Sequence, residues 1–207
     1  SHDIRTPING ICGMVDVGDH YSNDLQKQAD CRKKIREASN ILLELINEVL
    51  DMSKLESGEI LLEEKPFDVY KTINDVMDLV SRQADERGIK VEQTIEIEHR
   101  KLLGSSLYLK RMLMNILSNA VKYNKDYGNI DLSCKEIPSH STESTMLEFT
   151  CRDTGIGMSS GFKEHVFESF AREQKGGASK FGGTGLGMTI TKNLAEKMGG
   201  TITFESK

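Results

Sequence analysis

The chain has 207 residues, of which 37% are hydrophobic and 29% charged, as in ordinary globular proteins. Its formal net charge of −5 argues against nucleic-acid binding, because surfaces that follow phosphates need an excess of basic residues. No apolar run approaches the roughly 20 residues of a membrane span, and no signal-peptide pattern is present. Four cysteines far apart in the sequence (Cys12, Cys31, Cys134 and Cys151) predict free thiols in a reducing compartment. We expect a cytoplasmic chain or the cytoplasmic fragment of a longer protein.

Up to about Gly58 the apolar spacing is helical. At about 100° per residue the first apolar residues stay on one narrow stripe. The stripe continues through Pro7, which predicts a helix that is kinked there rather than ended. His2 lies about 160° from Ile4, on the side facing solvent, and Thr6 lies within about 40° of His2. The stripe consists of Ile4, Ile8, Ile11 and Val15.

A second helix is expected from about Cys31 to Ser57. Its apolar residues alternate at spacings of three and four, which is a heptad seam, and Gly58 stands where a C-cap glycine would. The segment HYSNDLQKQ is expected to form the turn before it. We expect two copies of this antiparallel hairpin to pair into a four-helix bundle; the alternative is a hairpin packed on the rest of the chain. The seam consists of Ile35, Ala38, Leu42, Leu45, Val49, Met52 and Leu55.

Beyond Pro66, helices alternate with short β-like runs, so the fold class is predicted to be α+β. We expect a hairpin over residues 1–58, a linker over 59–66 and a second domain over 67–207. The expected helices are 69–87, 106–123, a short one around VFESF, and TITKNLAEKM. The expected strands are KVEQTIEIE, NIDLSCKEI, TMLEFTCRD and a last strand, TITFES.

One predicted helix, LKRMLMNILSNAVKYN, carries an unusual polar face. Asn115, Asn119 and Lys122 follow one another at near i, i+4 spacing. Asparagine is a poor helix former, costing roughly half a kcal/mol against alanine, so two on one face need a reason. Amide oxygens suit Mg²⁺ or its waters, and the lysine suits a phosphate. The alternative is a solvated polar face.

Two glycine-containing segments follow. In TMLEFTCRDTGIGM, strand alternation puts Asp153 on the inward face with Phe149, where a carboxylate needs a donor such as a purine amino group. Gly155 and Gly157 allow close backbone approach. The alternative is a plain β-turn.

The second segment, GGTGLGMTITKNLAEKM, leads a glycine cluster into a helix whose free N–H groups suit phosphate. It matches neither a P-loop nor a Rossmann motif, and a flexible linker is the alternative. Phe167 and Phe170, at i, i+3, are expected to be core anchors. The cluster consists of Gly183, Gly185 and Gly187.

In sequence order, the His2 motif, NILSNAVKYN, DTGIGM, FESFARE and GGTGLG resemble the H, N, G1, F and G2 boxes of the sensor histidine kinases of two-component systems. The resemblance covers practically the whole chain. It implies a dimerisation and phosphoacceptor hairpin, followed by a Bergerat-type α/β sandwich that binds ATP and is related to the ATPase domains of gyrase and MutL. Those relatives lack the SHDIRTP helix, so this helix distinguishes a kinase from an ATPase.

The resemblance also implies roles for individual residues. His2 is the expected phosphoacceptor, the adjacent Asp3 orients its ring and takes a proton, and Thr6 positions water for dephosphorylation of a partner. Positive charge at the γ-phosphate is implied more weakly for Arg172, Lys175 and Lys180. The implied nucleotide contacts are Asn115 and Asn119 for Mg²⁺ and phosphate, Lys122 for phosphate, Tyr123 and Asp153 for adenine, Gly155 and Gly157 for the pocket, and Gly183, Gly185, Leu186 and Gly187 for the lid.

The activity implied is autophosphorylation of His2 by Mg·ATP, then phosphotransfer to an aspartate of a response regulator, by a homodimer. A phosphatase-biased kinase and a non-catalytic, nucleotide-gated dimerisation module are the alternatives. The family usually has three to four helical turns before the histidine, so a fragment is expected, with the full-length protein anchored to the inner membrane as one option. Ser105 replaces the family's usual Asp before the N-box helix, and both residues can cap a helix.

Overall fold

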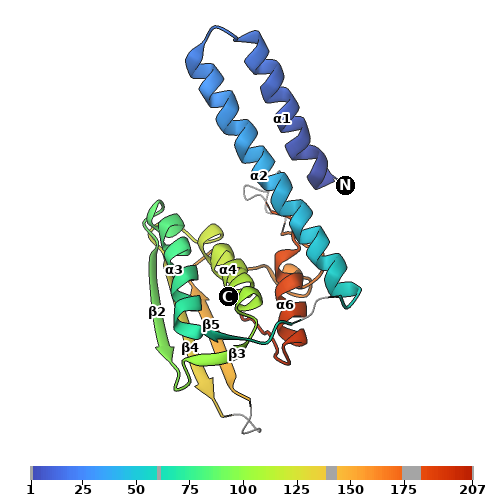
Figure 1. The fold of residues 1–207 in the computed structure, drawn as a ribbon. Helices are drawn as coiled ribbons and strands as arrows, with labels where there is room; N and C mark the ends of the chain where they lie inside the picture. The colour runs from blue at the N-terminus through green and yellow to red at the C-terminus, as the bar shows by residue number, and fades with distance from the viewer. Residues whose placement is uncertain (1, 60–61, 139–143, 174–182, 207) are drawn as a thin grey trace. The chain divides into compact units, whose positions relative to one another are not determined.

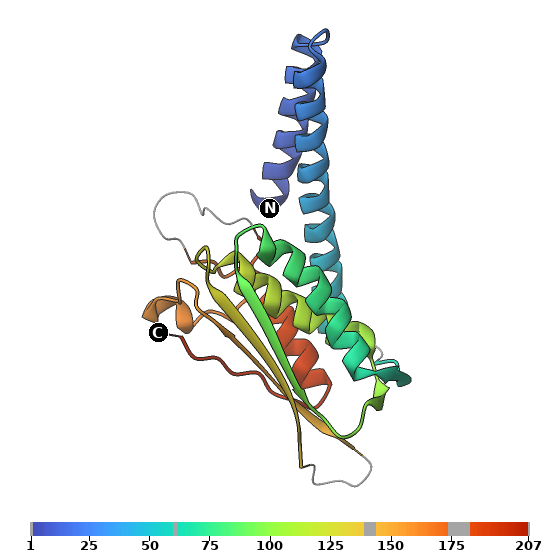
Figure 2. The same cartoon turned by 90° about the vertical axis from the view of Figure 1, so that its left-hand side faces the viewer.

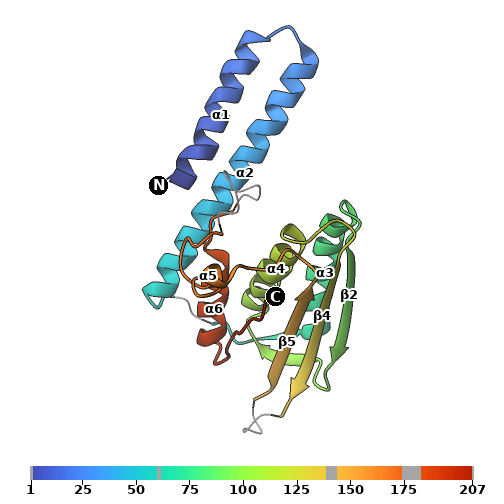
Figure 3. The same cartoon turned by 180° about the vertical axis from the view of Figure 1, so that it is seen from behind.

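The computed structural model describes residues 2–59, 62–138, 144–173 and 183–206. The chain divides into two compact units, residues 1–57 and 58–207. The first is a helical hairpin, and the second combines helices with two small sheets (Figure 1 and Figure 3). A hairpin followed by an α/β unit with a mixed sheet is the predicted fold class. In the described residues, no helix is both long and apolar enough to cross a bilayer.

The hairpin consists of α1, His2–His20, and α2, Leu25–Glu56, which lie side by side (Figure 1). Helix α1 continues through Pro7 as predicted. Helix α2 begins two turns before the predicted start at Cys31. The Asp24 carboxylate accepts a hydrogen bond from the Lys27 N–H at 3.0 Å and so caps the helix. The first two turns of α2 are largely polar, so apolar periodicity alone misses them.

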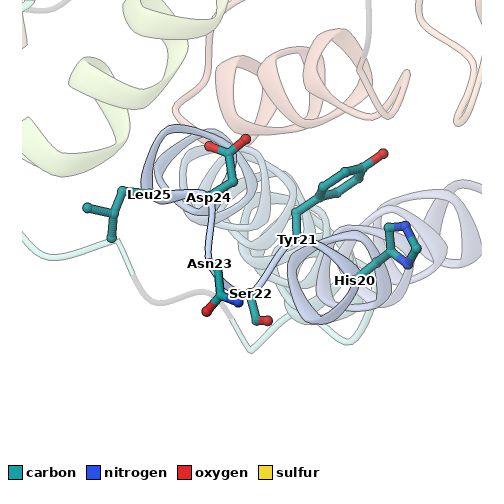
Figure 4. Close-up of a pocket in the computed structure, with 6 residues that line it drawn as sticks. All are labelled: His20, Tyr21, Ser22, Asn23, Asp24 and Leu25. Atoms are coloured by element: carbon teal, nitrogen blue, oxygen red, sulfur yellow. The ribbon is translucent and has the colours of Figure 1, made fainter.

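The turn between α1 and α2 is held by side chains. The Lys27 ammonium lies 3.3 Å from the centroid of the Tyr21 ring, and the Gln28 amide donates to the carbonyls of Gly18 and Tyr21. Residues 20–25 line an open pocket at this turn (Figure 4). These contacts fix the turn within the segment expected for it.

Much of the apolar surface of the hairpin is exposed. Cys31 and Leu45 are its buried hydrophobic residues in α2, whereas many others on both helices face solvent. Exposed apolar side chains in this number are costly in water and are typical of an interface. The exposed residues include Ile4, Ile8, Val15, Ile41, Leu43, Ile46, Val49 and Leu50.

The second unit contains two sheets. Strand β4, Asn129–Ile137, pairs in parallel with β2, Lys90–Glu96, and antiparallel with β5, Met146–Asp153. A separate two-stranded sheet pairs β1, Lys65–Asp68, with β3, Lys101–Gly104. The β1–β3 sheet was not predicted, and β1 begins inside the expected linker. The three-stranded sheet is covered on one face by helices α3, Val69–Asp85, α4, Ser106–Lys122, and α6, Gly187–Lys197 (Figure 2).

The core lies between these helices and the inward face of the sheet. Helix α3 buries residues spaced three and four apart, as an amphipathic helix should. On β4, alternate residues Ile130, Leu132 and Cys134 are buried, and Ile130 pairs with Asp153 of β5. The last residue of β5 therefore shares the face of the apolar row, as the alternation predicted. The other core residues include Val69, Ile73, Val76, Val80, Leu109, Leu113, Leu117 and Ala120.

Two further elements differ from the predictions. The short helix around VFESF is absent; α5, Ser160–Lys163, precedes it, because the Ser159 hydroxyl accepts from the Phe162 N–H at 3.3 Å and begins a helix there. The TITFES segment is not a strand. Instead, the Ser206 hydroxyl accepts from the Met158 N–H at 2.8 Å, and Phe204 packs edge-to-face on Phe167 at 5.6 Å.

Arg87 holds the C-terminal end of α4. Its Nη1 donates to the Val121 carbonyl at 2.6 Å, its Nη2 to the Asn124 carbonyl at 2.6 Å, and its Nε to Asp126 at 2.9 Å. The last carbonyls of a helix lack partners within it, and a guanidinium can supply several donors in one plane. Arg87 therefore fixes the segment that follows α4.

Replacing Arg87 by Ala is expected to lower the free energy of unfolding by about 2–3 kcal/mol, because charged hydrogen bonds to half-buried carbonyls are lost. Chemical denaturation would measure it. Arg87→Lys, which keeps the charge but not the planar fork, should recover only part of the loss. Arg82→Ala, an exposed site on α3, is the control and should stay within about 0.5 kcal/mol of the wild type. Equal stability of Arg87→Lys and the wild type would contradict this account.

Glu136, near the end of β4, holds the loop between β2 and β3. One carboxylate oxygen accepts the N–H groups of Glu98 and His99 at 2.8 and 2.9 Å, and the other contacts His99 Nδ1 at 2.6 Å. This side-chain hydrogen bond raises the pKa of His99 above 6.5. The backbone and side-chain hydrogen bonds of His99 lower the pKa of Glu136 below 4.5.

The stability that His99 contributes is therefore expected to depend on pH. The pKa of His99 is higher in the folded state than in the unfolded chain, where it is 6.5. Its contribution to folding stability is therefore complete at pH values below 6.5 and is lost as the pH rises through the raised pKa. The Glu136 contribution is lost only as pH falls through its lowered pKa. The melting temperatures of the wild type and His99→Ala should differ more at about pH 5.5 than at about pH 9. A pH-independent difference would rule out the ion pair.

Candidate nucleotide site

The predicted polar face of α4 is present and half-buried. The Ser105 hydroxyl accepts from the Tyr108 N–H at 3.4 Å and caps the helix, as expected. The Asn119 Nδ2 donates to the Asn115 Oδ1 at 3.5 Å one turn away. Both amides are therefore oriented relative to each other, unlike side chains on an ordinary solvated helix face.

Asn115 contacts the beginning of α6. Its Nδ2 donates to the Thr191 hydroxyl at 2.7 Å. Gly187, the first residue of α6, lies so close that a Cβ there would be 2.9 Å from the Asn115 Cγ and closer still to its Oδ1. The glycine is thus required by the close approach of α6 to α4. The structure brings together the N-box helix and the last glycine of the cluster.

Lys122 and Tyr123 lie at the end of α4. The Lys122 ammonium is 4.9 Å from the centroid of the half-exposed Tyr123 ring. A Cβ on Gly183 would lie 2.6 Å from this ammonium. The lysine therefore sits beside the start of the glycine cluster, where it can meet an anion bound by that backbone.

The DTG loop packs directly on the end of α4. The Ile156 N–H donates to the Tyr123 carbonyl at 3.0 Å, and a Cβ on Gly155 would lie 2.6 Å from that carbonyl. Gly157 adopts a φ of 62°, which favours glycine. The Gly155 N–H donates to Asp153 Oδ1 at 2.8 Å, and Asp153 is exposed. The carboxylate, which the sequence predicted to face inward, is therefore exposed at the end of β5 and accessible to a ligand.

Two polar residues that the sequence did not single out join these segments. Asn124 is buried; its Oδ1 accepts from the Thr154 hydroxyl at 3.1 Å and its Nδ2 donates to the Asn129 carbonyl at 3.1 Å. Thr154 Oγ1 also accepts from the Asn129 N–H at 2.9 Å. This network ties the end of α4 to the DTG loop. The contacts of Thr154 with Asn124 and Asn129 span 30 and 25 positions in the sequence, so no local pattern predicts them.

The glycine cluster meets the segment after α5. The Phe170 N–H donates to the Gly185 carbonyl at 3.1 Å, and the two residues have φ angles of 65° and 75°. A Cβ on Gly185 would lie 2.7 Å from the Ala171 carbonyl. Phe170 is 57% exposed, so the expectation that it anchors the core is wrong; its strained backbone serves this junction instead. Leu186 is fully buried.

The other predicted residues lie in the hairpin, outside the described residues, or on the segment after α5. Thr6 lies exposed on α1, while the side chains of His2 and Asp3 at its start lie outside the described residues. Lys175 and Lys180 also lie outside them, and Arg172 is half-buried. The described site therefore consists of the predicted residues on α4, the DTG loop and the glycine cluster.

Family models match both units. Residues 104–207 match the histidine kinase-, DNA gyrase B- and HSP90-like ATPase family, and residues 1–58 match the His Kinase A (phospho-acceptor) domain. The chain belongs to the sensor histidine kinase family. The predicted resemblance is confirmed, because the phosphoacceptor domain and the ATPase domain occur together and in the expected order.

Known histidine kinases are similar over the whole chain. The signal transduction histidine-protein kinase BarA of Escherichia coli is 34% identical over 209 residues, which cover 100% of this chain and 22% of BarA. The sensory/regulatory protein RpfC of Xanthomonas campestris is 34% identical over 99% of this chain and 28% of its own length. This chain thus corresponds to a limited part of each histidine kinase.

Solved structures of histidine kinases share the fold. Full-length ShkA in complex with AMPPNP is 27% identical, with a TM-score of 0.71, over 96% of this chain and 40% of ShkA. ThkA in complex with the response regulator protein TrrA is 20% identical, with a TM-score of 0.67, over 96% of this chain and 53% of that one. At 20% identity, the likeness to ThkA shows the fold alone.

Proposed function

We propose that this chain is the catalytic core of a sensor histidine kinase that binds Mg·ATP and transfers its γ-phosphoryl group to His2. The observation that carries the proposal is the convergence of three predicted motifs at the end of α4. Lys122 lies beside Gly183, and the Asp153 loop packs on the Tyr123 carbonyl. A cation, an aromatic face and an accessible carboxylate thus lie at one end of one helix, as a nucleotide requires.

The adenine end of the nucleotide is assigned to the DTG loop. One oxygen of Asp153 accepts the Gly155 N–H, and the carboxylate retains further lone pairs for the amino group of adenine. The half-exposed Tyr123 ring offers an apolar face for stacking. Gly155 and Gly157 keep the backbone close to α4. This arrangement favours a purine with an exocyclic amino group.

The phosphate end is assigned to Lys122 and the glycine cluster. Gly183, Gly185 and Gly187 precede or open α6, whose N-terminal N–H groups suit an anion. The ammonium of Lys122 supplies positive charge beside them. Phosphoryl transfer relies on positioning and charge stabilisation rather than on covalent chemistry from the protein. Leu186, fully buried, anchors the cluster to the core.

The donor set also fits Mg²⁺, which takes oxygen ligands in octahedral geometry. Within the described residues, the Asn119 side chain donates through Nδ2 to Asn115, and its Oδ1 accepts no hydrogen bond. Asn119 would hold the ion, while Asn115, whose amide contacts Thr191 and Asn119, would support it. When bound, Mg²⁺ neutralises charge on the phosphates.

The acceptor is assigned to His2 of α1. A neutral imidazole nitrogen attacks the γ-phosphorus, the bond to the β,γ-bridging oxygen breaks, and ADP leaves. Asp3 would orient the ring and take the proton released from its other nitrogen. The phosphoryl group then passes to an aspartate of a response regulator. ThkA, which shares the fold, was solved with such a partner.

We assign dimerisation to the hairpin, residues 1–58. A second copy in a four-helix bundle would cover part of its exposed apolar surface, to which Ile41, Leu43 and Ile46 contribute. Mass measurement in solution tests the dimer.

Thr6, exposed on α1 near the acceptor, would position water when the chain dephosphorylates its partner.

The proposal is tested by incubating the chain with γ-labelled Mg·ATP. Covalent label that is lost in acid and retained in base is expected, because phosphohistidine has that stability. Adding a phosphorylatable receiver domain should move the label to it. ATP binding without label or transfer would refute the kinase and favour a nucleotide-gated module. Accelerated loss of phosphate from a supplied phospho-receiver, without labelling, would favour a phosphatase.

A further inference from the structure

Thr191 is a buried residue of α6 that contacts the polar face of α4. It is 2% exposed, and the glycine motif ends four positions before it. Its Oγ1 donates to the Gly187 carbonyl at 3.0 Å and accepts from the Asn115 Nδ2 at 2.7 Å. A threonine hydroxyl has a single proton to donate. With that proton directed to the carbonyl, Thr191 can only accept from Asn115.

The orientation of the Asn115 side-chain amide determines the orientation of the Asn119 amide. Because Asn115 turns its NH₂ group to Thr191, its carbonyl oxygen is presented elsewhere, and the Asn119 NH₂ group donates to it at 3.5 Å. The Asn119 carbonyl oxygen is then the atom left for a ligand. An amide has a donor end and an acceptor end, so reversing Asn115 would reverse Asn119 as well.

We propose that Thr191 is a positioning residue for the metal ion, which sets the polarity of the Asn115 amide and thereby makes Asn119 present oxygen rather than NH₂ to Mg²⁺. The inference rests on the proposed binding of Mg·ATP. A hard cation accepts oxygen ligands and is repelled by an amide NH₂ group. Groups that orient a metal ligand typically change metal affinity by about 10–100-fold when removed.

The control is provided by α6 itself. Thr189 is also buried, and its hydroxyl donates to the Phe167 carbonyl at 2.9 Å. Thr189→Val therefore removes a buried hydroxyl from the same helix without touching the amides of α4. Thr191→Val keeps the shape of the side chain and removes the hydroxyl, and Thr191→Ser keeps the hydroxyl.

The experiment measures the dissociation constant of ATP by calorimetry, across a Mg²⁺ titration and in excess EDTA, for the full 207-residue chain. For the same decrease in the dissociation constant of ATP, Thr191→Val is expected to need a Mg²⁺ concentration about tenfold or more above that of the wild type. ATP affinity in EDTA should change little. Thr191→Ser should behave as the wild type, and so should Thr189→Val. Thr191→Ala, which cannot overpack the site, is a second variant with the same expectation as Thr191→Val.

Three results would overturn the inference: an unchanged Mg²⁺ requirement in Thr191→Val and Thr191→Ala, an equal change in Thr189→Val, or no recovery in Thr191→Ser. Melting temperatures in EDTA separate a loss of fold from a loss of metal affinity. If the wild type itself shows no Mg²⁺-dependent ATP binding, the proposed function fails first. That outcome is distinct, because it does not depend on any variant.

Discussion

Replacing His2 by Gln is expected to reduce the acid-labile label from γ-labelled Mg·ATP to background. Glutamine keeps a polar side chain of similar reach but lacks a nucleophilic ring nitrogen, so no phosphoramidate bond can form. ATP affinity should be unchanged, because the proposed nucleotide contacts are all assigned to residues 58–207, whereas His2 belongs to the hairpin. Filter-bound label and calorimetry measure the two quantities on the same preparations.

The matched control for His2 is His20, the last residue of the same helix. His20→Gln removes an imidazole from α1 at the turn of the hairpin, where its ring packs edge-to-face on Tyr21. It should be labelled as the wild type is. If the label persisted in His2→Gln and disappeared in His20→Gln, the acceptor would be His20, and its assignment to His2 would be wrong.

Gly187→Ala is expected to weaken ATP binding on the order of tenfold and to lower the melting temperature. In most helices this change stabilises by about 0.5–1 kcal/mol. Here the new Cβ would lie 2.9 Å from the Asn115 Cγ, and overpacking of a close contact costs about 1–3 kcal/mol. Pushing α6 from α4 displaces Asn115 and the glycine cluster together, and about 1.4 kcal/mol is a tenfold change in affinity.

Gly161→Ala provides the comparison for Gly187. Gly161 lies in α5, where an added Cβ would meet nothing within 4 Å, and its φ is not left-handed. The Gly161→Ala variant should bind ATP as the wild type does and melt at the same or a higher temperature. If Gly187→Ala behaved in the same way, the contact between α6 and Asn115 would have no role in the nucleotide site.

The parts predicted from the sequence are those with a local signature. Helix α4 was predicted with its Ser105 cap because capping and the 3.6-residue period act within a few turns. Strand alternation placed Asp153 on the sheet face of the apolar row, which agrees with its pairing to Ile130, but its side chain at the end of β5 is exposed and not buried. The roles of His2 and Asp3 remain predictions.

The parts that were missed depend on partners distant in the sequence. Strands β1 and β3 have four residues each, too few to show alternation. TITFES has the β-branched residues of a strand, but a strand also needs a neighbour with free hydrogen-bonding groups, and this segment is held by side-chain contacts instead. Phe170 was expected in the core because it lies three residues after Phe167, which is a helical spacing. The backbone at Phe170 is not helical, so that spacing does not place the two rings on one face.

The same reason explains Asn124, Thr154 and Arg87. Each is a common residue type in an ordinary context. The roles of Asn124 and Thr154 appear only when the end of α4 meets the DTG loop, and the role of Arg87 appears only when it meets the end of α4. Thr191 likewise looks like one more residue of an amphipathic helix. Residues that bind a nucleotide follow recurrent motifs, whereas those that hold the motifs in place do not.

The network around Asn124 also has a consequence for the motions of the unit. Asn124 bonds to Thr154 and Asn129, and Arg87 bonds to the Asn124 carbonyl, so Arg87, the end of α4, the start of β4 and the DTG loop are joined at one buried side chain, Asn124. Separating any one of them exposes polar atoms that the others need, which makes partial opening unfavourable. The DTG loop and the end of α4 therefore form a single cooperative unit of local unfolding. Slow exchange of its amides with solvent would report on the whole junction rather than on one loop.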